Sequence, residues 1–177
     1  SGETAVSKLS RLRAAMKEQK ATVHLLSSLD DIAWLLNIRK QSEDGNLLPL
    51  AHMLITGDSA RLFVDSRNFP SQLHPYFKDC GVLVERYEDI YEAVSALRGE
   101  AVLALFKSID GSNRVIEEMN PTSLMKAVKN PVEMENMRRA HVKDGVALTK
   151  FIRWMKTEGQ TADFTETEAA ERLEGLR

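Results

Sequence analysis

The chain has 177 residues, of which 43% are apolar and 28% charged, and its formal net charge is -2. This length allows one domain of ordinary size and part of another, and the charge gives no case for a nucleic-acid or membrane surface. No apolar run approaches the length of a membrane span, and no signal peptide opens the chain. The single cysteine, Cys80, excludes an internal disulfide and favours a reducing compartment, so we expect a cytoplasmic protein.

The first predicted elements are a helix, a strand and a second helix. Apolar residues at helical spacing, with basic residues between them, predict an amphipathic helix over 4–20. A short apolar run predicts a buried strand over 21–27, and a short helix is expected over 30–36. Residues 39–46 are polar and predict a loop.

The middle of the chain predicts a hairpin followed by alternating helices and strands. Apolar runs over 51–56 and 60–65 are separated by Gly, Asp and Ser, which indicates two antiparallel strands. A helix is expected over 70–79, a strand over 82–86 and another helix over 89–97. The cysteine lies between the first of these helices and the strand, where a small buried residue is expected rather than a nucleophile.

The end of this region completes the predicted sheet. A nearly continuous apolar run over 101–106 predicts an inner strand, with Leu105 in the core. Residues 112–119 are expected to be helical, and Asn120-Pro121 is expected to break that helix. Because strands and helices alternate while the hairpin is antiparallel, the fold class is α/β, with a mixed sheet and helices on both faces.

A long helix is predicted over 131–157 by clear starting signals. Asn130 is a good N-cap, Pro131 suits the first helical position, and Glu133 falls at the capping-box position. Its apolar stripe consists of Met134, Met137, Ala140, Leu148, Phe151, Ile152 and Met155. Because the rest of the chain offers little to cover this stripe, we expect self-association through the helix; folding back on the α/β domain and fraying are the alternatives.

The chain divides near the start of that helix. Residues 4–129 contain the complete α/β pattern, whereas residues 130–177 contain only helices, the second of them capped by Thr165 with Glu168 three residues later. The first residues, Ser1 and Gly2, lack an initiator methionine. We therefore expect the chain to be a segment of a longer protein.

Two charged clusters are interpreted as solvated helix faces. The basic side of the first helix carries Lys8, Arg11, Arg13, Lys17 and Lys20. Its apolar side carries Val6, Leu9, Leu12 and Met16. The acidic cluster of the last helix consists of Glu166, Glu168, Glu171 and Glu174. For the basic side, the alternative is a stripe that binds phosphate.

No catalytic or metal-binding constellation is visible in the sequence. The four histidines are scattered: His24, His52, His74 and His141. None has metal-ligand spacing with another histidine or a glutamate. His141 and Asp144 share a helical face, where we expect them to form a surface contact; a partial set of metal ligands is the alternative. The helix dipole explains the presence of Glu133 and Glu135 in the first turn. We therefore assign no catalytic, cofactor-binding or metal-binding residue to this chain.

Two blocks of sequence resemble a known family. The first is Ser28-Leu-Asp-Asp-Ile-Ala-Trp-Leu-Leu-Asn-Ile-Arg39, which resembles the signature of the creatinase N-terminal-like domain. The second comprises Lys126 to Asn130, Glu135, Met137, Arg138, Arg139, Ala140, His141 and Asp144. It resembles the start of the catalytic domain in the Xaa-Pro aminopeptidases (aminopeptidase P) of the pita-bread metallopeptidase family.

The resemblance implies a non-catalytic role for this chain within a hydrolase. In that family two divalent metals, usually manganese, are bound by two Asp, one His and two Glu on strands well downstream of the helix that 131–157 resembles. The chain would therefore be the middle domain plus the first two helices of an incomplete pita-bread domain, without cofactor or activity of its own. Its expected partners are the catalytic domain of the longer protein, which would act on peptides with proline second, and other copies of the chain.

The loop over 39–49 departs from the family pattern. In the family that this chain resembles, the residue matching Arg39 is usually followed by Gly, then an Asp, then Asn-Pro. Here Lys40 replaces the Gly, and two leucines separate Asn46 from the Pro that follows. We interpret this segment as a solvated loop that Trp34 and Leu35 anchor to the core. The alternative is a loop that gates substrate at a catalytic cleft.

Two other functional classes remain open. A related architecture occurs in a histone-chaperone subunit that has lost its metals, and such a protein would bind other proteins rather than cut them. Creatinase or prolidase, which have a related N-terminal domain, form the second rival. The Ala-Trp-Leu-Leu-Asn-Ile-Arg signature ending at Arg39 favours an Xaa-Pro aminopeptidase over both.

Overall fold

The computed structural model describes five stretches of the chain: residues 2–38, 50–65, 73–104, 111–161 and 163–177. The chain forms two compact units, one of residues 3–128 and one of residues 129–177. The predicted loop over 39–49 and the core position Leu105 lie outside the described residues.

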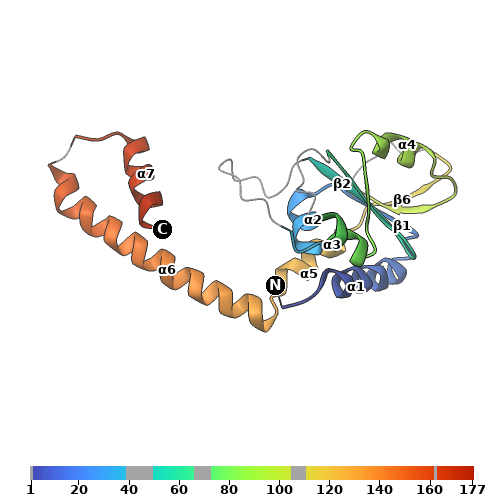
Figure 1. Cartoon of the computed structure of the whole chain (residues 1–177), viewed down its shortest axis with the longest axis horizontal. Helices are drawn as coiled ribbons and strands as arrows, with labels where there is room; N and C mark the ends of the chain where they lie inside the picture. Colours follow the sequence, from blue (N-terminus) through green and yellow to red (C-terminus); the bar gives the residue numbers. More distant parts are fainter. Residues whose placement is uncertain (1, 39–49, 66–72, 105–110, 162) are drawn as a thin grey trace. The chain divides into compact units, whose positions relative to one another are not determined.

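The first unit is built on a six-stranded mixed sheet in the order β4-β3-β2-β1-β5-β6 (Figure 1). The strands are β1 (Val23–Leu26), β2 (Ala51–Thr56), β3 (Ala60–Val64), β4 (Leu83–Glu85), β5 (Ala101–Leu103) and β6 (Arg114–Ile116). β2 is antiparallel to both β1 and β3, whereas the β1–β5, β3–β4 and β5–β6 pairs are parallel. The predicted hairpin and the mixed sheet are both confirmed.

Helices cover both faces of the sheet, as predicted. They are α1 (Ala5–Glu18), α2 (Leu29–Leu35), α3 (Leu73–Asp79), α4 (Asp89–Ser95) and α5 (Pro121–Ala127). α1, α2 and α3 pack in the larger core cluster with one face of the sheet, and α4 packs with the other face (Figure 1). Strand side chains alternate between the faces, so Leu26 and Leu62 lie in the larger cluster and Leu25 and Phe63 in the smaller one.

The predicted helix over 112–119 is wrong. Residues Arg114–Ile116 form β6, which pairs parallel to β5 at the edge of the sheet. Asn120-Pro121 does not break a helix but starts α5, because Asn120 is its N-cap and Pro121 its first residue. Two β-branched residues, Val115 and Ile116, suit the strand better than the helix.

The basic face of α1 is only partly solvated, which corrects the sequence interpretation. Lys8 is completely buried, and Arg13 donates hydrogen bonds to the carbonyls of Thr56 and Ser59 at 3.0 and 3.1 Å. Val6, assigned to the apolar side, is 50% exposed. The other predicted core positions of this helix are buried: Leu9, Leu12 and Met16.

The second unit contains α6 (Pro131–Lys156), a 3-10 turn (Glu158–Gln160) and α7 (Glu166–Leu176). Both predicted capping boxes are present, one between Asn130 and Glu133 and one between Thr165 and Glu168. The pKa of Glu168 is lowered because its carboxylate accepts hydrogen bonds from the backbone and side chain of Thr165. Trp154 connects the two helices, since its ring lies 4.9 Å from that of Phe164 and 4.3 Å from the Arg172 guanidinium. Among the described helices, none is long and apolar enough to cross a membrane.

Candidate functional site

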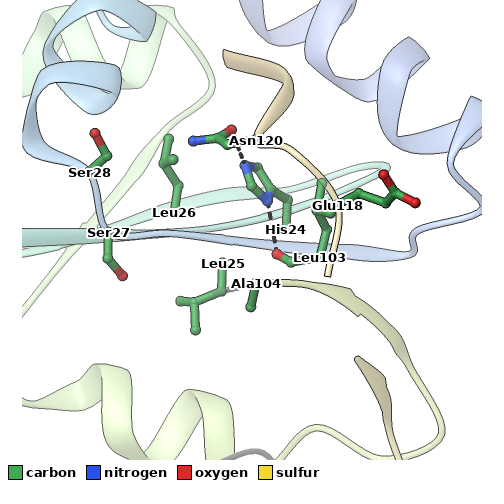
Figure 2. A pocket seen from close by; sticks show the side chains of 9 residues that line it. All are labelled: His24, Leu25, Leu26, Ser27, Ser28, Leu103, Ala104, Glu118 and Asn120. Carbon is green, nitrogen blue, oxygen red and sulfur yellow. Dashed lines mark hydrogen bonds between the residues drawn. The ribbon is translucent and has the colours of Figure 1, made fainter. Parts of the chain in front are cut away.

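A cavity of about 270 Å³ opens at the carboxyl ends of the parallel strands β1 and β5 (Figure 2). Its lining residues are His24, Leu25, Leu26, Ser27, Ser28, Leu103, Ala104, Glu118 and Asn120. Carboxyl ends of parallel strands are where α/β sheets most often bind ligands. The cavity is therefore a candidate functional site of this unit.

His24 is the most deeply buried polar side chain of this cavity. Its Nδ1 lies 2.9 Å from the Leu103 carbonyl oxygen, and its Nε2 lies 3.2 Å from Asn120 Oδ1, as the dashed lines in Figure 2 show. The Asn120 amide cannot turn round, because its Oδ1 accepts from the Thr122 N–H at 3.1 Å and its Nδ2 donates to Asp31 at 2.9 Å. A neutral imidazole can satisfy only one of its two oxygen neighbours, since it carries one N–H.

Burial nevertheless keeps His24 neutral. Desolvation lowers its pKa below the usual 6.5, and this effect exceeds the opposing influence of the Leu103 and Asn120 hydrogen bonds and of the Asp31 carboxylate. A neutral, buried imidazole between two fixed oxygens is suited to holding β1, β5 and the start of α5 together. Nothing in this geometry prepares the ring to act on a substrate.

We expect the stability of the α/β unit to fall as the pH drops below about 6.5. Because the pKa of His24 is lower in the folded state, its contribution is complete above the unfolded pKa and is lost as the pH falls toward the folded value. The loss should reach up to about 1.4 kcal/mol per pH unit while only the unfolded imidazole is protonated. The measurement is urea unfolding between about pH 5 and pH 8, a range that brackets the pKa of an ordinary histidine.

Two substitutions separate His24 from the other titrating groups. His24→Gln should flatten the pH dependence, whereas His141→Gln, on exposed α6 surface, should leave it as in the wild type. His52 supplies part of the remaining slope, because burial lowers its pKa as well. An unchanged slope in His24→Gln would contradict this role.

A second polar cluster lies on the other face of the sheet. His52 Nδ1 is 2.8 Å from Ser27 Oγ, and His52 Nε2 is 3.2 Å from the Tyr87 hydroxyl. The two aromatic rings stack, with centroids 5.3 Å apart. A serine beside a histidine can support acyl transfer, but a nucleophilic triad also needs a carboxylate to orient the imidazole. Here a phenol takes that position, so the cluster is best described as a structural contact.

The four histidines lie on four different elements of the described structure. His24 pairs with Ile55 in the β1–β2 register, so both side chains lie on the same face of the sheet. His52 lies three positions before Ile55 on β2, and because side chains alternate along a strand, it lies on the opposite face. His74 lies in α3 and His141 is exposed on α6. Within the described residues, no group of three or more His, Cys, Asp or Glu side chains could hold a metal ion.

The other sequence-predicted candidates lie on surfaces or at the edge of the core. Asp144 is 2.7 Å from Arg177, and the four glutamates of the acidic cluster are exposed. Cys80 is half-buried against the larger core cluster and follows α3. Tyr76, one turn earlier, donates to the Leu36 carbonyl at 2.8 Å, and burial raises its pKa to about 12.

Sequence reasoning missed the buried carboxylate of Asp31 and its partners on α5. Asp31 is 2% exposed and accepts hydrogen bonds from Asn120 and Ser123, and its other oxygen lies 2.7 Å from Lys126 Nζ. A signal for the start of α5 was present in Asn120-Pro121, since the same Asn-Pro pair begins α6 at Asn130-Pro131.

Comparison with known proteins places the fold in a family. A family model described as the creatinase/prolidase N-terminal domain matches residues 1–133. A probable Xaa-Pro aminopeptidase P from Sordaria macrospora is 31% identical to this chain, over 99% of the chain and 32% of that protein. The chain spans about a third of the length of the curated relatives it matches.

Solved structures share the fold at lower identity. An X-prolyl aminopeptidase from Caenorhabditis elegans, described as a cytosolic enzyme with a di-nuclear active site, aligns over 99% of this chain and 31% of its own. The TM-score is 0.84 at 24% identity. The N-terminal domain of the FACT complex subunit SPT16 from chickpea aligns over 98% of this chain and 50% of its own, with a TM-score of 0.67 at 14% identity. With its mixed α/β sheet and a family match over residues 1–133, the chain belongs to the creatinase/prolidase N-terminal domain family.

Proposed function

We propose that this chain is the non-catalytic middle-domain segment of a metal-dependent Xaa-Pro aminopeptidase, which removes an N-terminal residue that precedes proline. The supporting observation is the 31% identity to a probable Xaa-Pro aminopeptidase P along 99% of the chain. Residues 4–129 would form the domain that precedes the catalytic domain, and residues 130–177 would be the first helices of the catalytic domain. The domain would shape the cleft and limit the length of peptide admitted.

The chemistry would belong to residues outside this chain. A peptide bond to proline has no N–H and a restricted shape, which general peptidases handle poorly. When bound, a pair of divalent ions, which we propose to be manganese, polarises the carbonyl and supplies hydroxide. The related C. elegans enzyme is described as having a di-nuclear active site and as cytosolic, and we propose both features for the longer protein.

The purified chain should show no aminopeptidase activity. The reason is that the metal-ligating residues of the proposed catalytic domain would lie beyond it. The assay is release of the first residue from an Xaa-Pro peptide with added manganese. Turnover at an enzyme-like rate by this chain would overturn the assignment of a non-catalytic segment.

We propose further that α6 mediates self-association of the isolated chain. Five residues of its apolar stripe are between 37% and 45% exposed: Met134, Met137, Leu148, Ile152 and Met155. Exposed apolar stripes of this kind favour association with a partner. Sedimentation should show a concentration-dependent dimer that a Phe151→Glu, Ile152→Lys double variant abolishes. If both proteins are monomers at high concentration, the pairing is wrong.

A second candidate is a metal-free binding module of the chaperone type. The observation that favours it is the match to the SPT16 N-terminal domain, which at 14% identity concerns the fold alone. A creatinase-type or prolidase-type hydrolase is a third candidate. Histone binding by the longer protein without release of an N-terminal residue would favour the chaperone reading.

A further inference from the structure

A single buried carboxylate meets two hydrogen-bond donors and one ammonium group from one face of α5. Asp31 Oδ2 accepts from Asn120 Nδ2 at 2.9 Å and from Ser123 Oγ at 3.1 Å. Asp31 Oδ1 lies 2.7 Å from Lys126 Nζ. The three residues Asn120, Ser123 and Lys126 follow one another at intervals of three, from the N-cap to the last turn of the helix, and residues at this spacing share one face.

The position of Asp31 makes this contact depend on its charge. Its side chain is 3% exposed, whereas that of Lys126 is 34% exposed. A buried carboxylate is costly unless hydrogen bonds and an opposite charge compensate it. It also lies close to the amino-terminal end of α5, where the helix dipole favours a negative charge. The arrangement therefore stabilises the carboxylate and α5 together.

Fully buried side chains of α5 are confined to its first turn. Only Pro121 and Thr122 are buried in this helix, whereas Leu124 is 61% exposed and Val128, which follows it, is 70% exposed. A helix of seven residues is marginal without tertiary contacts. The Asp31 contacts therefore attach α5 to α2 through polar groups, and α5 also lies against α1.

α5 is the last element of the α/β unit, so its attachment affects where the chain leaves that unit. α5 ends at Ala127, the first compact unit ends at Val128, and α6 begins at Pro131. The chain therefore passes from the fixed helix into the second unit through only a few residues. Whatever holds α5 therefore sets the point at which the chain leaves the α/β unit.

We propose that Asp31 is a positioning residue, which anchors α5 to the α/β unit and so fixes the exit of the chain toward the helices that follow. In the longer protein, the same contacts would position the catalytic domain that those helices begin. This second step rests on the proposed function. Asp31 would touch neither metal nor substrate. Its effect would be transmitted through Asn120, Ser123 and Lys126.

Native-state hydrogen exchange tests the anchor in this chain. Asp31→Asn should raise amide exchange in α5 at least tenfold and leave exchange in the β2–β3 hairpin unchanged. Asp30→Asn is the matched control, since Asp30 precedes it in the same first turn of α2 but is exposed, and it should change neither region. Exchange in α5 that stays as in the wild type, or that rises only in parallel with the hairpin, would overturn the proposal.

Activity of the longer protein tests the consequence. Asp31→Asn should lower kcat/KM for an Xaa-Pro peptide by about tenfold with metal content unchanged, and Asp30→Asn should not. If α5 exchange rises while kcat/KM stays the same, Asp31 anchors the helix but does not position the catalytic domain, and that part of the proposal is wrong. If the wild-type longer protein releases no residue, the proposed function fails, and the exchange experiment still decides the anchor.

Discussion

Replacing Leu62 with alanine should lower the free energy of unfolding of the α/β unit by about 2–5 kcal/mol. Leu62 is completely buried in β3, between the neighbouring strands β2 and β4, and lies in the larger core cluster. The substitution removes three carbon atoms from a packed core and leaves a cavity that the sheet cannot easily close. Urea unfolding followed by Trp34 fluorescence measures the loss, in a Trp154→Phe background that leaves one tryptophan.

Leu83 provides the matched control for this experiment. It lies in β4 next to the residue that pairs with Leu62, but its side chain is 63% exposed. Leu83→Ala should therefore change the free energy of unfolding by less than about 0.5 kcal/mol. A loss below about 0.5 kcal/mol for Leu62→Ala would show that β3 is not a core strand.

Replacing Lys8 with methionine should destabilise the same unit by about 2–3 kcal/mol. Lys8 is completely buried, and its ammonium donates to the Trp34 carbonyl and to Asn37 Oδ1, both at 2.7 Å. The ammonium also lies 4.1 Å from the centroid of the Trp34 ring. Methionine preserves the volume of the side chain but takes these donors away from the carboxyl end of α2.

Lys17→Met distinguishes the buried role of Lys8 from a general effect of removing charge. Lys17 lies on the same helix and is exposed, so its replacement should leave stability nearly unchanged. The comparison is made by the same urea titration. Equal stabilities for the two variants would mean that the Lys8 contacts contribute nothing to the stability of the unit.

Local signals explain which elements could be predicted from the sequence. α6 and α7 begin with capping boxes whose residues are three positions apart, so the information lies within one turn of helix. The β2–β3 hairpin is similarly defined by the short turn that joins its strands. The bounds of α6 and of the two hairpin strands, and the start of α7, could therefore be predicted, because their determinants are contiguous in the chain.

Long-range contacts explain the failures. β6 forms because Val115 and Ile116 pair with β5, a partner that no local pattern identifies. The burial of Lys8 depends on the Trp34 carbonyl, and Asp31 meets Asn120 across 89 positions of sequence. A buried charge looks like a surface charge in the sequence, because only the fold brings its partners to it. The polar network at the cavity could not be inferred for this reason.

Release of the first residue from an Xaa-Pro peptide by the longer protein, assayed beside this chain, tests the proposed function most directly. We predict that the longer protein is active with manganese, that a chelator abolishes the activity, and that this chain is inactive under every condition. Activity of this chain by itself would contradict the account. So would a longer protein that stays inactive with manganese while it binds histones.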